Sequence, residues 1–318
     1  MLKGALCFLT TLLIASSLNA QIRIIDAQGE HLFEKPPTKV VALNWAMAEQ
    51  LIELDAPLLA VSDVAGYQEW VVQPALPEGI QDLGARAEPN LEKMARLQPD
   101  LIIVSGITKE QVARLKNIAP VLNFNTFNSD HNNPQVAIDT FRQLALLFNK
   151  SQLAEQKLSA MQQRFTELRS ALTTAYQGKL PKVSTVRFAN TASVYIYGDN
   201  SMSQYALKQL GIKPALDIAT TQWGLVQKRV LELSKIQTGS VLYFEPFNEY
   251  PQLQASRLWQ AMPIVRNNKV AAVPATWTYG GAMSLKYLAE AMATSLLTLA
   301  PNATEQNPVK NASNEAVQ

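Results

Sequence analysis

The side chains best suited to chemistry in this sequence are one arginine and several aromatic residues in loop-like contexts. Arg86 closes a turn that contains a glycine, Trp223 is followed directly by a glycine, and Trp277 opens the segment WTYGG at 277–281. A guanidinium presents several N–H donors in one plane, and an indole can bury about 150–250 Å² while keeping its N–H donor. These residue types suit an organic ligand that carries oxygen acceptors. Taken alone, however, Arg86 is better explained by a surface ion pair with Glu88.

Groups for nucleophilic or metal chemistry are scarce in the chain. Its two histidines are His31 and His131, and its single cysteine is Cys7. Protein sites for zinc and related metals usually combine several histidine and carboxylate ligands. The sequence also has no glycine-rich phosphate loop, no G-x-S-x-G elbow and no H-E-x-x-H motif. We therefore expect neither an enzyme nor a metal held by protein side chains.

The first twenty residues have the pattern of a secretory signal peptide. Lys3 precedes an apolar stretch at 6–15, and small residues lead to a cleavage site after Ala20. That stretch is shorter than the roughly 20 apolar residues that span a bilayer. Cys7 lies inside the apolar stretch instead of after it, so we expect a cleaved periplasmic protein and not a lipoprotein. The mature chain, from Gln21, then has no cysteine for a disulfide bond.

Length and composition predict a globular protein of two domains. The chain has 318 residues, and domains commonly hold roughly 150 residues. Apolar residues make up 47% of the chain and charged residues 17%, while the formal net charge is only +2. That charge offers no electrostatic reason to expect nucleic acid as a partner. We divide the chain into a signal peptide (1–20), an N-terminal lobe (21–148), an interlobe helix (149–178), a C-terminal lobe (179–300) and a disordered tail (301–318).

Short apolar runs alternate with segments of helical period in both halves of the chain. In the first half we expect strands at 40–43, 58–61, 101–104 and 121–124, with helices at 46–54, 91–97 and 108–119. In the second half we expect strands at 183–188, 194–197, 241–244 and 270–273, with helices at 203–210, 231–236, 256–262 and 285–299. This alternation is typical of α/β folds with parallel sheets. The two lobes are therefore predicted to be Rossmann-like.

A long helical region, from Pro134 to about Tyr176, separates the two halves. It is interrupted at 149–150, after which Ser151 is a plausible N-cap. The second part carries a one-sided apolar stripe that consists of Leu158, Met161, Phe165, Leu168 and Leu172. A helix of this length could bridge two lobes, although an ordinary core helix would show the same period.

Several segments together resemble the periplasmic binding proteins that carry ferric siderophores, cobalamin and haem. They read KVVALNWAMAEQLIELDAPLLAVSD, LGARAEPNLEKMARLQPDLIIVSG and LWQAMPIVRNNKVAAVPATWTYGGAMS. Within that class, the ALNW, QEWV, GARAEPNLE and QWG segments are most similar to the hydroxamate siderophore binders of the ferrichrome type. The resemblance spans about residues 35–299. It implies two α/β lobes joined by one rigid helix, with the ligand in a shallow cleft between them.

The resemblance also assigns roles to particular residues. It implies that Arg86 hydrogen-bonds the hydroxamate oxygens of a ferric siderophore whose iron is already saturated, so that the protein needs no cofactor. It implies aromatic pocket walls made by Trp45, Trp70, Trp223 and Trp277, with Tyr67 and Tyr279 as further candidates. Trp259, in contrast, is expected in the core. Glu92 and Glu232, one on each lobe, are expected to meet arginines of an inner-membrane ABC permease dimer, with the binding protein a monomer.

One departure from the ferrichrome-type pattern leaves the ligand open. Family members have a phenol after the strand at 101–104, but here the stretch is Ser105-Gly106-Ile107-Thr108. The same scaffold could therefore bind a citrate-type siderophore, cobalamin or haem, and His131 could serve haem as an axial ligand. A cluster of extra basic residues, such as Arg187, Lys228 or Arg229, would favour an anionic chelate. A periplasmic siderophore hydrolase is the remote alternative, because no Ser–His pair is evident.

Overall fold

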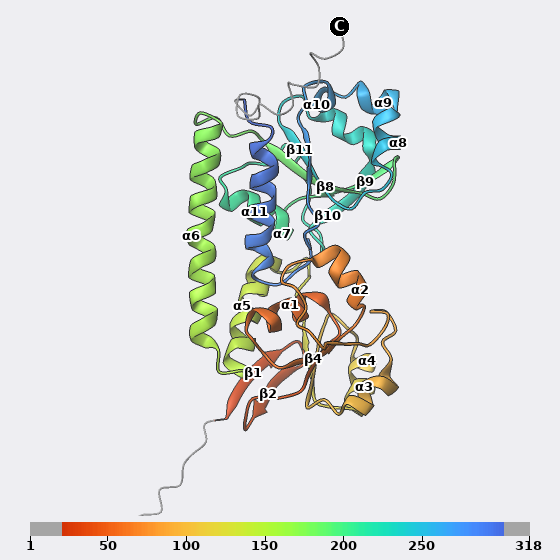
Figure 1. The fold of residues 1–318 in the computed structure, drawn as a ribbon, viewed down its shortest axis with the longest axis vertical. Coiled ribbons are helices and arrows are strands. Elements are labelled where there is room, and N and C mark those ends of the chain that lie inside the picture. Colours follow the sequence, from red (N-terminus) through yellow and green to blue (C-terminus); the bar gives the residue numbers. More distant parts are fainter. Residues whose placement is uncertain (1–20, 302–318) are drawn as a thin grey trace, which may run out of the picture.

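The apolar runs of the chain form the strands of two separate sheets, each with five strands. The computed structural model describes residues 21–301, and Figure 1 shows one sheet in each of two lobes, with a long helix along one side. The predicted signal peptide (1–20) and residues 302–318 of the predicted tail lie outside the described residues. Across residues 21–301, no helix has both the length and the apolar character needed to cross a bilayer.

The N-terminal sheet is parallel throughout, with the strand order β5-β4-β3-β6-β7. Its strands are β3 (Val40–Ala42), β4 (Leu58–Val61), β5 (Gln81–Asp82), β6 (Leu101–Ser105) and β7 (Val121–Phe124). Every residue of β3 and β7 is buried, as expected for parallel strands covered on both faces. Four of the five strands were predicted. The fifth, β5, is too short and polar to produce a sequence signal.

The C-terminal sheet is mixed, with the order β10-β9-β8-β11-β12. It consists of β8 (Val183–Phe188), β9 (Ser193–Tyr197), β10 (Leu225–Arg229), β11 (Ser240–Phe244) and β12 (Val270–Val273). β8, β11 and β12 are parallel, whereas β9 is antiparallel to both β8 and β10. The predicted parallel pairing therefore holds for β8, β11 and β12, whereas the two pairings of β9 are antiparallel. The connection at 189–192 is too short for a crossover, which takes a dozen or more residues.

A hairpin of β1 (Ile22–Asp26) and β2 (Gly29–Phe33) precedes the first lobe. The helical segments of that lobe are α1 (Trp45–Glu53), α2 (Val64–Gly66), the π-helical turn η1 (Tyr67–Val71), α3 (Leu91–Leu97) and α4 (Lys109–Leu115). Asn44 caps α1 by accepting hydrogen bonds from the backbone N–H groups of Ala46 and Met47. The helix predicted at 108–119 is shorter than expected, because α4 ends at Leu115 and residues 116–118 form a turn before Pro120.

In the second lobe, the helical segments are α7 (Met202–Gln209), the 3₁₀ helix η2 (Val230–Lys235), α8 (Tyr250–Ala255), α9 (Arg257–Gln260), α10 (Pro263–Arg266) and α11 (Ser284–Leu297). The helix predicted at 231–236 is thus a 3₁₀ helix, and the helix predicted at 256–262 is the shorter α9, which ends at Gln260. Trp259, in α9, is only 2% exposed. The expectation that it belongs to the core is confirmed.

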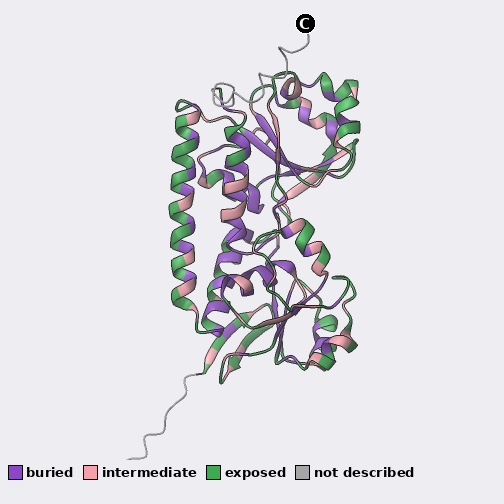
Figure 2. Cartoon of the chain, viewed as in Figure 1, coloured by how far each residue is buried: buried purple, intermediate pink, exposed green. Residues whose placement is uncertain are grey.

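The lobes are connected by α5 (Asn133–Leu147) and α6 (Ser151–Ala175). α6 has 25 residues, which corresponds to a length of about 38 Å. Its predicted stripe is buried against α5, α7 and α11, while the opposite face is exposed along the whole helix (Figure 2). The N-cap prediction was wrong: Lys150 occupies that position without a side-chain bond, and Ser151 is the first helical residue.

One buried apolar cluster extends through both lobes. It runs from Val40 and Leu51 in the N-terminal lobe, past Phe165 on α6, to Leu288 and Met292 on α11. Each lobe also has one smaller buried apolar cluster of its own. The two lobes therefore share a continuous core along the side of α6, which resists a large hinge movement on that side.

Candidate ligand-binding site

Three of the predicted site residues lie in segments that follow strands of the two sheets, whereas Trp223 lies between α7 and β10. Trp45 begins α1 after β3, Arg86 follows β5, and Trp277 lies in the segment between β12 and α11. Ligands of open α/β sheets commonly bind outside the carboxyl ends of the strands. On the N-terminal lobe, this edge has a cavity of about 510 Å³ whose lining includes Arg86, Ser105 and Ile107.

Arg86 is held between an indole and a carboxylate. Its guanidinium carbon lies 3.6 Å from the ring centroid of Trp45 and 5.8 Å from that of Trp277. Its Nε lies 3.5 Å from Oδ2 of Asp63, and its side chain is 44% exposed. Partial burial lowers the pKa of Arg86 below its ordinary value, and Asp63 opposes that change. The group stays cationic, so its remaining N–H donors can serve an oxygen-rich ligand.

A continuous series of aromatic rings crosses from one lobe to the other. The centroid of Trp45 lies 4.9 Å from that of Trp277, which lies 5.3 Å from Tyr279. Tyr279 in turn contacts Phe127 of the first lobe at 5.9 Å and Trp223 of the second at 5.8 Å. Phe127 and Trp223 are stacked with their centroids 5.4 Å apart. Trp223 is 49% exposed, so a large apolar ring faces solvent at the end of this series.

Trp70 lies opposite a second arginine. It extends from η1 in the N-terminal lobe, and its ring lies 5.1 Å from the guanidinium carbon of Arg187 on β8 in the other lobe. That carbon is also 5.8 Å from the ring of Phe244. Nη1 of Arg187 donates to the carbonyl of Glu245, but Nη2 is buried without a hydrogen-bond partner in the described part of the chain. A buried N–H without a partner is costly, so this group is suited to meet an oxygen atom of a ligand.

Trp45 and Tyr67 differ from the other candidates because both are almost fully buried. Trp45 is 3% exposed and donates from its indole to the carbonyl of Ser62 at 3.0 Å. Tyr67 is 1% exposed and donates from its hydroxyl to the carbonyl of Pro74 at 2.8 Å. Their rings are in edge contact, with centroids 6.3 Å apart. The ring of Trp45 thus packs against the guanidinium of Arg86, and the ring of Tyr67 packs against Trp45.

Tyr279 keeps its phenol in the protonated form. Burial raises the pKa of Tyr279, the nearby Tyr197 adds to the rise, and the charge of Arg187 opposes it. The hydroxyl of Tyr197 is already shared with Thr278 at 2.8 Å. A neutral phenol both donates and accepts, so Tyr279 can contribute one donor to an oxygen of a ligand.

Hydrogen bonds between segments of the two lobes position Trp223. Asn133, at the start of α5, is fully buried, and its side-chain amide donates to the carbonyls of Asn200 at 3.0 Å and Gln222 at 2.8 Å. The side-chain amide of Gln222 donates back to the carbonyl of Phe127. These bonds connect the segments that carry Phe127 and Trp223, so the stacked pair is held by backbone on both sides.

The stretch that lacks the family's phenol lines the cavity beside Arg86. Ile107 contributes apolar surface there, and the hydroxyl of Ser105 is engaged with that of Thr126 at 2.6 Å. Gln111 and Arg114 of α4 complete the polar lining. The cavity beside Arg86 is therefore also bordered by the amide of Gln111 and the guanidinium of Arg114.

The two predicted docking glutamates are both on the surface of the lobes. The side chain of Glu92 is 84% exposed in the first turn of α3, with Arg96 3.7 Å away. The side chain of Glu232 is 30% exposed in η2 and is paired with Lys235 at 2.5 Å. The neighbouring Leu231 is 47% exposed. The docking role of both glutamates stays a prediction.

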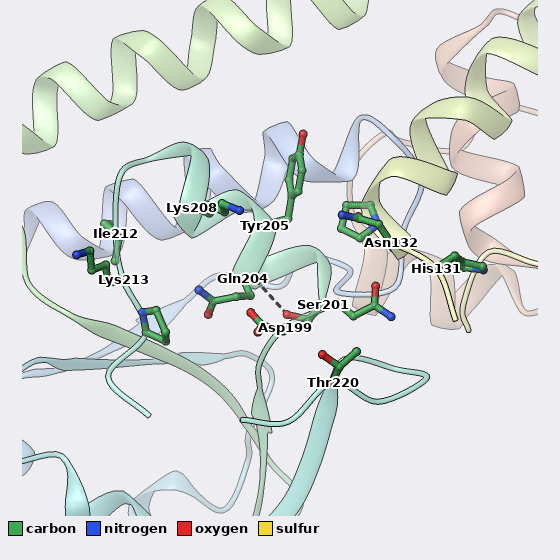
Figure 3. Close-up of a pocket in the computed structure, with 13 residues that line it drawn as sticks. His131, Asn132, Asp199, Ser201, Gln204, Tyr205, Lys208, Ile212, Lys213 and Thr220 are labelled. Carbon is green, nitrogen blue, oxygen red and sulfur yellow. Dashed lines mark hydrogen bonds between the residues drawn. The ribbon is translucent and has the colours of Figure 1, made fainter. Parts of the chain in front are cut away.

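His131 lies outside the aromatic series. It borders a cavity of about 600 Å³ between α7 and the start of α5, to which Ser201, Gln204 and Lys208 also contribute (Figure 3). None of the predicted aromatic residues lines this cavity. Nε2 of His131 lies 3.1 Å from the carbonyl of Asn125. Within residues 21–301, no group of three or more histidine, cysteine or carboxylate side chains is placed to hold a metal ion.

Two residues of the site were missed or left undecided by sequence reasoning. Phe127 was not considered, although its place after the buried strand β7 puts it at the edge where ligands bind. Arg187 was left as an open possibility. The detectable signal was a charged residue inside β8, in which the other five residues are buried.

Comparison with known proteins places these observations in a family. The family described as periplasmic binding protein matches residues 40–276. The iron(3+)-hydroxamate-binding protein FhuD of Escherichia coli is 32% identical over 254 residues, which cover 78% of this chain and 83% of that protein. The Fe(3+) dicitrate-binding periplasmic protein FecB of the same species is 24% identical over 260 residues, covering 79% of this chain and 82% of that protein.

A solved structure agrees with most of the chain. The siderophore-binding protein FhuD from Vibrio cholerae, solved with Fe3+-Desferal bound, superposes with a TM-score of 0.81 at 48% identity, covering 83% of this chain and 99% of that chain. The predicted α/β fold of two lobes is thereby confirmed. Because relatives in this family are binding proteins, the expectation that the chain is not an enzyme is confirmed as well. The protein belongs to the periplasmic binding protein family.

Proposed function

We propose that this protein captures an iron(III)-hydroxamate siderophore in the periplasm and delivers it to an inner-membrane ABC importer. The observation that carries the proposal is the position of Arg86, stacked on the buried Trp45 at the start of an aromatic series that joins the two lobes. The Escherichia coli relative named for iron(3+)-hydroxamate and the Vibrio cholerae relative bound to Fe3+-Desferal support this choice of ligand.

The arrangement suits a chelate whose iron is already fully coordinated. Hydroxamate oxygens keep partial negative charge, so the guanidinium of Arg86 and the phenol of Tyr279 can each donate to them. Trp223, Trp277 and Trp70 offer apolar surface for the organic skeleton. The protein contributes no ligand to the iron and needs no cofactor, and the ferric siderophore is its cargo.

Delivery to the importer requires a second surface. We infer that Glu92 and Glu232, on the surfaces of the two lobes, meet arginines of a permease dimer while the binding protein acts as a monomer. The N-terminal sequence supports export to the periplasm with a signal peptide that is then cleaved. It does not support attachment of the protein to a lipid anchor. We infer a division of the chain into lobes at about residues 148 and 179, which is supported by the break between α5 and α6 and by the end of α6 at Ala175.

A citrate-type ferric chelate is the second candidate, favoured by one observation. Arg187 places a buried Nη2, which has no hydrogen-bond partner among residues 21–301, across from Trp70, so each lobe contributes arginine to the site. Two cations suit a chelate with free carboxylates better than a neutral hydroxamate. The ferric dicitrate-binding relative is consistent with this alternative.

Tryptophan fluorescence separates the two candidates. The protein from Gln21 onward is titrated with ferrioxamine B, ferrichrome and ferric citrate. We expect quenching with submicromolar Kd for a hydroxamate, weakened by Arg86→Ala, and no effect from Arg257→Ala, which removes an exposed arginine from α9 of the other lobe. Arg187→Ala should weaken ferric citrate more than the hydroxamates. Saturable binding of ferric citrate alone would overturn the hydroxamate assignment.

A further inference from the structure

Two acidic side chains of α1 are buried where the lobes meet. Glu49 is 2% exposed and Glu53 is 7% exposed, and both face α11 of the C-terminal lobe. Neither contributes to the aromatic series or to the arginine pair of the proposed site. Buried carboxyl groups are rare and costly unless they have partners, so their role calls for an explanation.

Glu49 is bonded to the segment that carries the aromatic residues of the second lobe. Its Oε2 accepts a hydrogen bond from the backbone N–H of Gly281 at 2.9 Å and another from the hydroxyl of Ser284. Gly281 lies two residues after Tyr279 and four after Trp277. One carboxyl group of the N-terminal lobe therefore holds the end of the WTYGG segment of the C-terminal lobe.

The fit around this contact is tight. A Cβ added to Gly280 would overlap Glu49 and Ser284, and one added to Gly281 would overlap the side chain of Gln50. Both glycines are buried and have ordinary backbone angles, so close approach and not backbone freedom accounts for them. A small displacement of the Glu49 side chain would therefore displace the WTYGG segment as well.

The surroundings of Glu49 and Glu53 differ in charge. Glu53 is paired with Lys157 of α6 at 2.6 Å and accepts a hydrogen bond from the phenol of Tyr287 on α11. Among the described residues, Glu49 has no such cation within contact distance and its Oε1 has no hydrogen-bond partner. Burial raises the pKa of Tyr67 on η1, and the charge of Glu49 is close enough to add to that rise. Burial raises the pKa of Glu49 to about 8, the bonds from Ser284 and Gly281 oppose the rise, and the charge of Glu53 adds to it.

We propose that Glu49 is a positioning residue that holds the Trp277–Gly281 segment in place for the ligand, and that ionisation of its carboxyl group loosens this segment. The protonated carboxyl group accepts both hydrogen bonds without bringing a charge into the core. The ionised group would be a buried anion beside Glu53, and relief of that repulsion requires water to enter between α1 and α11. The part of the inference that concerns ligand affinity rests on the function proposed above.

Matched variants of one position test the inference. Glu49→Gln keeps an oxygen that can accept from Gly281 and Ser284 but cannot ionise, whereas Glu49→Ala removes the acceptor. Glu155→Gln, at an exposed carboxylate of α6 that is paired with Arg142 of α5, is the control. Two quantities are measured between pH 6 and pH 9: the tryptophan emission of the free protein, and the Kd for ferrioxamine B.

We expect the emission of the free wild-type protein to change with a midpoint near pH 8, and the affinity at pH 9 to be about tenfold weaker than at pH 6. Glu49→Gln should abolish both changes and bind at pH 6 as the wild type does, while Glu155→Gln should retain both. Glu49→Ala, where it folds, should bind weakly at every pH. A transition that persists in Glu49→Gln would overturn the inference, and so would weak binding by Glu49→Gln at pH 6.

The design separates this inference from the proposed function. Tight binding of the hydroxamate without any pH transition that depends on Glu49 would leave the function standing and refute the positioning role. A transition in the free protein that Glu49→Gln removes, together with no hydroxamate binding at all, would refute the function and retain the role of Glu49 in holding the segment.

Discussion

The guanidinium carbon of Arg86 lies 3.6 Å from the ring centroid of Trp45, so the cation packs on an indole that is itself buried. Trp45 is 3% exposed and its N–H group is bonded to the carbonyl of Ser62. A cation over an aromatic ring gains about 0.5–2 kcal/mol. The arginine is therefore oriented before any ligand arrives, which reduces the entropy lost on binding.

The first prediction concerns the shape of this cation. We expect Arg86→Ala to weaken ferric hydroxamate binding by about ten- to a hundredfold, because a hydrogen bond to a charged group contributes about 1.5–3 kcal/mol. Arg86→Lys should recover little of that loss, since an ammonium group lacks the planar set of donors. Isothermal titration calorimetry measures both values. Recovery of wild-type affinity by lysine would show that only the charge matters.

The second prediction contrasts two tryptophans of the C-terminal lobe. Trp223 is 49% exposed, whereas Trp259 is 2% exposed and contacts Phe188 in the outer core. Trp223→Ala should weaken ligand binding with little effect on stability. Trp259→Ala should reduce the free energy of unfolding by about 3–5 kcal/mol.

Urea unfolding and ligand titration of the same two variants provide the measurements. The folded fraction of Trp259→Ala should still bind the ligand with nearly wild-type affinity. A loss of stability in Trp223→Ala as large as that in Trp259→Ala would contradict the assignment of Trp223 to the binding surface.

The third prediction concerns stability and pH. The pKa of Glu49 is about 8 in the folded protein and about 4.5 in the unfolded chain, so the folded state binds an additional proton between these values. The contribution of the Glu49 carboxyl group to the free energy of unfolding is therefore fully present below about pH 4.5 and is lost as the pH rises to about 8. The Glu49→Gln variant should show no such loss, because its side chain cannot ionise.

Thermal unfolding at pH 5 and pH 8 tests this sign. Relative to the wild type, Glu49→Gln should gain stability as the pH rises, by at most about 4 kcal/mol. An equal difference between the two proteins at both pH values would show that Glu49 does not change its protonation there. Glu155→Gln again serves as the control.

The fourth prediction separates docking from ligand binding. Glu92→Ala and Glu232→Ala should leave the Kd for the siderophore unchanged, because neither residue touches the aromatic series. Both should reduce uptake and the ATPase stimulation of the cognate importer, and the double variant should be the weakest. The exposed Glu155→Ala is the comparison. Full uptake by the double variant would exclude these two glutamates as the docking contacts.

Much of the fold could be predicted because its signals are local. The stripe from Leu158 to Leu172 has helical spacing, and those residues are buried on α6 as expected. The apolar run at 101–104 became the buried strand β6. Such periodicity follows from how side chains project from a single helix or strand. The N-cap at Ser151 was wrong by one position, because cap geometry depends on the backbone at the break.

Pairing between distant segments could not be predicted in the same way. β10 consists largely of polar and charged residues, and it is a strand because its backbone pairs with β9. Arg187 meets Trp70 only because two lobes come together, and no spacing along the chain records that distance. Residue type likewise did not reveal that Trp45 would be buried beneath Arg86 while Trp223 would be exposed.

The amino-acid sequence by itself determined the α/β elements, the long helix α6 and the residue types available for an oxygen-rich organic ligand. Tertiary structure alone decided which of those side chains meet: Arg86 on Trp45, Phe127 on Trp223, and Glu49 against Gly281. The physical reason is the separation along the chain over which each feature is determined. Helical and strand periods arise within a few residues, whereas a binding site and the protonation of a buried carboxyl group depend on which distant surfaces exclude water together.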